Sequence, residues 1–137
     1  MVRPEIVRKR LNKLDEYLSI LDELRQANQE IFNTDPQLYG SAERFLHLAI
    51  ETTLDMGSHI IADENLGVVN HYRDIPTILT DKGIIEAELA QRWIKMVGFR
   101  NILIHDYLDI DRSIVYDVLQ NNLDDFRALQ RFFAQFL

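Results

Sequence analysis

The sequence predicts an all-α protein, an up-and-down bundle of four helices with one short connecting helix. Its 137 residues include five glycines and three prolines, so few positions interrupt a helix. The apolar residues recur every three or four positions, which is helical spacing rather than the alternation of a half-buried strand. Apolar residues make up 47% of the chain and charged residues 27%, as in ordinary globular proteins. We therefore expect residues 1–137 to form a single domain with one core.

The first two predicted helices meet at a clear boundary. Apolar residues step by three and four from about Arg3 to Phe32 and predict one long helix there. The stripe consists of Val7, Leu11, Leu14, Leu18 and Leu21. The segment from Asn33 to Pro36 then supplies a capping side chain and a proline suited to a first helical turn. We expect the second helix to run to about Asp63.

The second half of the chain predicts a connector and two further long helices. Pro76 and Gly83 bracket the short helix, expected over Tyr72–Leu79. The next helix is expected to begin near Glu86 and to carry the segment Arg100–Tyr107. Asp111 or Ser113 can cap the last helix. The cluster Phe132, Phe133, Phe136 and Leu137 must dock on the bundle or on a second subunit, because an apolar chain end otherwise frays.

Composition and charge exclude several classes of protein. The net charge of −7 argues against a protein that coats nucleic acid non-specifically, because that function needs a broad basic surface. The absence of cysteine leaves no disulfide or thiolate metal site. No apolar run approaches the roughly 20 residues of a membrane span, and the first residues lack a signal peptide. We expect a cytoplasmic protein that uses no membrane and no cofactor.

The segment RNILIHDY, from Arg100 to Tyr107, concentrates reactive groups within an otherwise apolar helix. Arginine offers a planar fork that matches a phosphate, and histidine carries or accepts a proton near neutral pH. Asn101 can contact the same phosphate or a ribose, and Tyr107 offers a hydroxyl for covalent modification. The expected chemistry is phosphodiester cleavage by an internal 2′-hydroxyl, with Arg100 and His105 as the catalytic pair.

Helical geometry separates these groups. On an ideal helix Arg100 and Tyr107 lie nearly on one face, whereas His105 lies roughly 140° away from Arg100. Either the helix unwinds near His105, or two copies of the chain combine their residues across a twofold axis. The homodimer is the attractive solution, and Arg92, Lys95 and Arg100 of both copies are then the expected local cations for RNA.

Simpler readings of the same residues stay open. Cations are favoured at a helix C-terminus whatever their function, so Arg100 and His105 can be purely structural. His47, His59 and His71 lack the clustered spacing of a zinc site, and we predict no metal. Asp55 and His59 are four residues apart on one helical face and can form a buried hydrogen-bonded pair or line the cleft. The acidic residues Asp106, Asp109 and Asp111 suit a loop and a helix cap.

The motif also resembles a known family. Arg100, His105 and Tyr107 form an Arg-x4-His-x-Tyr pattern preceded by Met-Val-Gly-Phe at 96–99. The stretch HIIADENLG at 59–67 and the triplet Tyr72-Arg73-Asp74 precede it in the right order. These segments are similar to the HepT toxins of the HEPN superfamily, and the resemblance extends from the second helix through the last one.

This resemblance implies a fold, an activity and partners. The expected protein is a HEPN-like bundle and the toxin of a type II toxin-antitoxin system, a homodimer that cleaves cellular RNA without a metal ion. Arg100 and His105 match the family's catalytic pair. An MNT-type nucleotidyltransferase antitoxin is implied to neutralise the toxin by transferring AMP from ATP to Tyr107. The alternative is a helical dimer that binds a nucleotide or docks a partner without catalysis.

Overall fold

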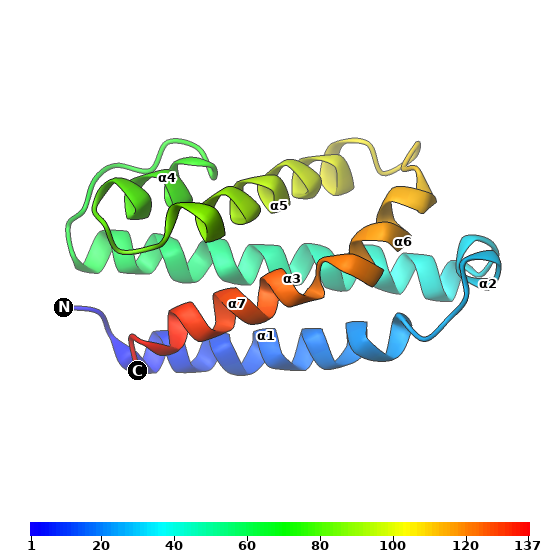
Figure 1. Cartoon of the computed structure of the whole chain (residues 1–137), viewed down its shortest axis with the longest axis horizontal. Coiled ribbons are helices and arrows are strands. Elements are labelled where there is room, and N and C mark those ends of the chain that lie inside the picture. The colour runs from blue at the N-terminus through cyan, green and yellow to red at the C-terminus, as the bar shows by residue number, and fades with distance from the viewer.

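The computed structural model describes residues 1–137 and contains helices without strands. The helices are α1 (Pro4–Leu24), α2 (Gln29–Thr34), α3 (Pro36–Asp63), α4 (Asp74–Asp81), α5 (Ala87–His105), α6 (Arg112–Asn121) and α7 (Leu123–Ala134). Four rods, formed by α1, α3, α5 and the pair α6 with α7, lie side by side in a bundle (Figure 1). The short α4 lies against α3 and α5. The predicted all-α bundle with a short connecting helix is confirmed. No helix combines the length and the apolar character that crossing a membrane requires.

The first helix is shorter than predicted. It ends at Leu24, and α2 begins after Asn28, whose side chain accepts a hydrogen bond from the Ile31 N–H at 2.9 Å. A contact from the far end of the chain fixes the turn between them. The Arg25 guanidinium donates to the Gln120 carbonyl at 2.9 Å, and the Gln120 amide donates to the Arg25 carbonyl at 2.8 Å. The sequence pattern missed the break because the contact that fixes it is 95 residues away along the chain.

The other helix boundaries differ less from the prediction. Asp35 caps α3 through the Gln37 N–H, and Pro36 takes the first helical position as expected. Asp111 caps α6 through the Ser113 N–H at 2.9 Å. The predicted last helix is two helices, because the chain leaves helical geometry at Asn122. The connector is shifted by two residues toward the C-terminus relative to the predicted Tyr72–Leu79.

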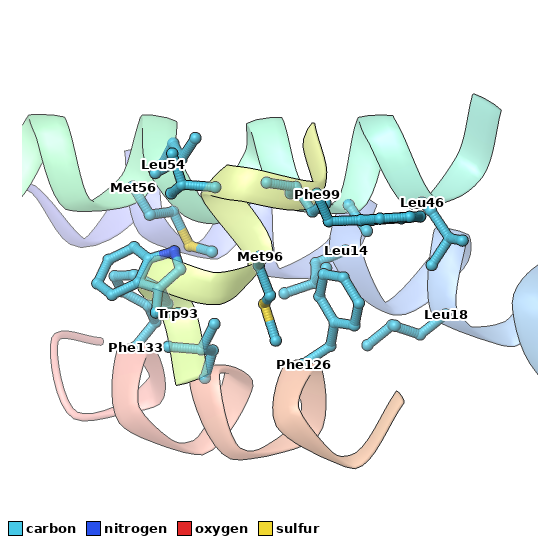
Figure 2. Packing of buried hydrophobic residues seen from close by; sticks show 14 of the residues in the cluster. Leu14, Leu18, Leu46, Leu54, Met56, Trp93, Met96, Phe99, Phe126 and Phe133 are labelled. Atoms are coloured by element: carbon cyan, nitrogen blue, oxygen red, sulfur yellow. The ribbon is translucent and has the colours of Figure 1, made fainter. Parts of the chain in front are cut away.

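The core is one continuous cluster that reaches from the N-terminal half of α1 to the last turn of α7. Figure 2 shows its centre, where Trp93 and Met96 of α5 meet Phe126 and Phe133 of α7. Trp93 is fully buried, and its indole N–H donates to the Thr53 hydroxyl at 3.0 Å. The phenylalanines at the chain end therefore dock on the bundle itself. This packing fixes the position of α5, the helix that carries the reactive segment.

Gly57 allows α3 to approach α4 and α5 closely. A Cβ atom at this position would lie 2.9 Å from Cη2 of Trp93 and would also clash with a methyl group of Ile75. We expect Gly57→Ala to lower the free energy of unfolding by about 1–3 kcal/mol, because overpacking displaces buried side chains.

Gly40, on the same helix, is the matched control for this prediction. A Cβ atom there meets no atom within 4 Å. Gly40→Ala is expected to leave stability unchanged or to raise it by about 0.5–1 kcal/mol. Urea unfolding of both variants measures the difference, and equal midpoints would contradict the packing argument.

Candidate functional site

Arg100 projects from α5 toward α3 rather than into open solvent. Its side chain is 13% exposed, and its Nε donates to the carboxylate of Glu51. Its guanidinium also stacks on the Tyr72 ring, with Cζ 4.2 Å from the ring centroid. A third contact joins Nη1 to Oδ1 of Asn101 at 3.3 Å. The guanidinium is therefore held in one orientation by groups from three parts of the chain.

Glu51 contacts the side chains of both Arg100 and His47. The same oxygen that accepts from Arg100 lies 3.2 Å from Nε2 of His47, four residues earlier on α3. Glu51 and Tyr72 are the site residues that sequence reasoning missed. The spacing of His47 and Glu51 was a visible signal for an ion pair on one helical face, but nothing local connects that pair to Arg100.

His105 occupies a different side of α5. It is the last residue of the helix and is exposed, whereas Arg100 is half-buried against α3. Both residues are helical, so the expected angle of roughly 140° between their directions holds. One chain does not bring the two side chains together along the helix. Ile102, Tyr107 and Leu108, each within three residues of His105 along the chain, are also exposed.

Tyr107 lies outside the helix, which corrects the prediction that it shares a helical face with Arg100. The chain leaves helical geometry at Asp106, and the Asp109 N–H donates to the Asp106 carbonyl at 2.9 Å in the turn that follows. Short acidic side chains at these positions favour the turn over a further helical turn. Tyr107 is 67% exposed, so its hydroxyl is open to a modifying enzyme.

The predicted cation cluster does not form within one chain. Arg92 donates to Oδ1 of Asp125 at 3.0 Å and lines a separate pocket with Lys95, between α5, α6 and α7. Arg100 is instead engaged by Glu51. Asp55 and His59 do not form the expected buried hydrogen bond: Nε2 of His59 lies 3.7 Å from Oδ1 of Asp55, and both side chains are partly exposed. Arg10 of α1 pairs with Asp55 instead.

A pocket of about 640 Å³ opens beside Arg100. Residues 69–73 before α4 form one wall, and Val97 and Asn101 of α5 form the other. Asp74 shapes the loop, because its carboxylate accepts from the backbone N–H groups of His71 at 2.9 Å and Asn70 at 3.0 Å. These hydrogen bonds hold the pKa of Asp74 below its usual value.

Fold and site together define a class: an all-helical bundle that presents an Arg-x4-His-x-Tyr segment at the end of its fifth helix. The chain belongs to the family described as Ribonuclease HepT-like, which matches residues 14–132. The family resemblance inferred from the sequence is thereby confirmed.

Relatives and solved structures extend this result. The mRNA nuclease HepT of Shewanella oneidensis is 36% identical over 95 residues, which are 69% of this chain and 71% of that protein. The tRNA nuclease HepT of Aphanizomenon flos-aquae is 26% identical over 115 residues, covering 84% and 78% of the two chains. The fold is similar to a tri-AMPylated Shewanella oneidensis HEPN toxin in complex with its MNT antitoxin. That match has a TM-score of 0.88 and 27% identity over 95% of this chain and 97% of the other.

Proposed function

We propose that this chain is the toxin of a toxin-antitoxin pair and cleaves RNA without a metal ion, at a site built from Arg100 and His105. The observation that carries the proposal is the arrangement on α5. An oriented, half-buried guanidinium and an exposed imidazole lie in its last two turns, within a chain of the ribonuclease HepT-like family. The nuclease names of the two relatives support the same reaction. Cellular RNA in the cytoplasm is the proposed substrate.

The reaction follows from what each group can do. The 2′-hydroxyl loses its proton to one imidazole, and its oxygen attacks the adjacent phosphorus. The bond from phosphorus to the 5′-oxygen breaks, and that oxygen takes a proton from an imidazolium. The products are a 2′,3′-cyclic phosphate and a 5′-hydroxyl. Arg100 binds the phosphate and offsets the charge that develops on its oxygens, while Asn101 contacts the phosphate or the neighbouring ribose.

The proposed site is complete in a homodimer. Arg100 and His105 of one chain point in different directions, so a twofold axis near the end of α5 is needed to place both types of group in one cleft. The exposed side chains of Ile102, Tyr107 and Leu108 give such an interface its apolar contacts.

Neutralisation is proposed to act through Tyr107. An MNT-type nucleotidyltransferase would let the phenol oxygen attack the α-phosphorus of ATP, releasing pyrophosphate and leaving AMP on the tyrosine. The structural relative that is tri-AMPylated in complex with its MNT antitoxin supports this step. A nucleotide tethered two residues from His105 would compete with RNA at high effective concentration.

The proposal is tested with purified protein, a short RNA and EDTA. We expect cleavage in EDTA with products ending in a 2′,3′-cyclic phosphate. The same sequence with 2′-O-methyl riboses should stay intact, because it lacks the attacking hydroxyl. Cleavage of the methylated strand, or cleavage that EDTA abolishes, would overturn the mechanism. Absence of any cleavage would favour the alternative of a non-catalytic nucleotide-binding dimer.

Glu51 provides a second check on the role assigned to Arg100. Its carboxylate orients the guanidinium, so Glu51→Leu should lower the cleavage rate about 10- to 100-fold, the value of one hydrogen bond to a charged group. Glu51→Gln keeps an acceptor oxygen and should retain most of the activity. Equal losses in the two variants would show that charge or packing, rather than the hydrogen bond, is what Glu51 supplies.

A further inference from the structure

The pocket beside Arg100 has a lining unusual for so acidic a protein. The chain carries 22 acidic and 15 basic side chains, yet the seven lining residues include an arginine and no carboxylate. The polar members are Asn70, His71, Tyr72, Arg73 and Asn101. All five are exposed, while Val97 beneath them is buried. The pocket thus has an apolar floor and a rim of hydrogen-bonding groups.

Each of these groups suits part of a nucleotide. Tyr72 is 45% exposed and presents an aromatic ring on which a base can stack. Asn70 and Asn101 offer amide donors and acceptors that match the edge of a base. The Arg73 guanidinium forms no ion pair within the chain and is available to a phosphate. The volume of about 640 Å³ lies in the range of small-ligand pockets.

The loop that forms one wall is already ordered. The Asp74 carboxylate is directed to the backbone N–H groups of Asn70 and His71. The negative charge of Asp74 is therefore stabilised by hydrogen bonds from the loop backbone. A preformed wall lowers the ordering cost of binding.

The pocket is continuous with the proposed catalytic residues. The Tyr72 ring lines the pocket and also stacks against the Arg100 guanidinium, whose Cζ lies 4.2 Å from the ring centroid. Asn101, on its other wall, follows Arg100 directly in the chain. His105 lies one helical turn beyond Asn101, on the face of α5 that Asn101 occupies and not on the face of Arg100. A second, smaller depression shares Arg73, Val97 and Asn101 and extends the hollow along α5. A group bound here lies next to any phosphate that Arg100 holds.

We propose that this pocket is a subsite for one nucleoside monophosphate unit, with the base beside Tyr72 over Val97 and the phosphate toward Arg73. This inference rests on the proposed function, since it places the nucleotide next to the cleaved bond. Two sources supply the same chemistry: a nucleotide of the RNA substrate, or the adenylyl group attached to Tyr107.

The test measures binding of 5′-AMP to the full chain by calorimetry at low salt, with His105→Ala as the parent so that the protein can be produced safely. Arg73→Gln and Tyr72→Leu should each weaken binding about tenfold, as expected for loss of one phosphate contact or one stacked base. Tyr72→Phe keeps the ring and should bind within about twofold of the parent. Arg8→Gln is the control, because it removes the same single positive charge from an exposed arginine of α1. This variant should bind AMP as tightly as the parent does.

Binding separates this inference from the proposed function, because it needs no catalysis. If AMP is not bound, or if Arg73→Gln and Tyr72→Leu bind it as tightly as the parent does, the subsite is wrong even where RNA is cleaved. If AMP binds and both variants lose it, the subsite stands even where RNA is not cleaved. Measuring the binding of free AMP to protein that already carries AMP on Tyr107 shows which of the two nucleotide sources occupies the pocket. Loss of free AMP binding assigns the pocket to the tethered adenylyl group, and unchanged binding assigns it to the RNA nucleotide.

Discussion

Replacing His105 by alanine is expected to slow RNA cleavage about 10²- to 10⁴-fold, the usual contribution of a general acid or base. Cells that express the variant without the antitoxin should grow, whereas cells that express the wild-type chain should not. His105 is exposed at the end of α5, so the variant is expected to stay folded.

His59→Ala is the matched control for this result. His59 lies on α3 beside Asp55 and contacts none of the residues in the proposed site. That variant should remain as toxic as the wild type. Equal growth inhibition by His105→Ala and wild type would remove the imidazole from the mechanism. If cells expressing either histidine variant grew normally, the loss of toxicity would be explained by lower protein stability rather than by loss of a catalytic imidazole.

Replacing Tyr107 by phenylalanine is expected to release the toxin from its antitoxin while leaving the toxin active. The change removes one oxygen from an exposed side chain in the turn after α5, and the hydroxyl makes no hydrogen bond within the chain. Folding and cleavage should therefore be unaffected. The antitoxin then has no phenol to modify, so co-expression should no longer rescue growth. Intact-mass measurement should show AMP on the wild-type chain and none on the variant.

Tyr39→Phe is the control for loss of a tyrosine hydroxyl. Tyr39 lies on α3, with its ring covered by the Arg112 guanidinium at 3.8 Å. That variant should still be modified and neutralised. A Tyr107→Phe chain that the antitoxin still neutralises would exclude modification of Tyr107 as the mechanism of inhibition.

The sequence predicted what depends on local spacing. The apolar stripe of α1 and the presence of caps before α3 and α6 depend on residues within one or two helical turns, and the structure confirms them. The structure then selects Asp35 within the segment Asn33–Pro36, and Asp111 over Ser113. The break after Leu24 escaped prediction because the hydrogen bonds between Arg25 and Gln120 join distant segments. Tyr107 was assigned to a helical face because ideal geometry was extended past the true helix end at His105.

The residues of the candidate site divide in the same way between local and long-range signals, and their functional roles stay predictions. Arg100, Asn101, His105 and Tyr107 stand together in the sequence, so their association needed no knowledge of the fold. Glu51 and Tyr72 contact Arg100 only through packing of α3 and the loop before α4 against α5. An acidic residue on an amphipathic helix has the same local pattern whether it faces solvent or a buried cation. The long-range contact therefore had to come from the structure.

The position of Arg100 depends on segments that lie both before and after it in the chain. Glu51 and Tyr72 precede Arg100, but α5 is held in place by α7, whose Phe126 and Phe133 pack on Met96 and Trp93 (Figure 2). Those phenylalanines belong to the last helix of the chain. A chain that lacks α7 would leave Met96 and Trp93 without these partners, so the packing that holds α5 in place would be lost. A truncation before α7 is therefore expected to abolish the proposed cleavage, although Arg100, Asn101, His105 and Tyr107 are all still present.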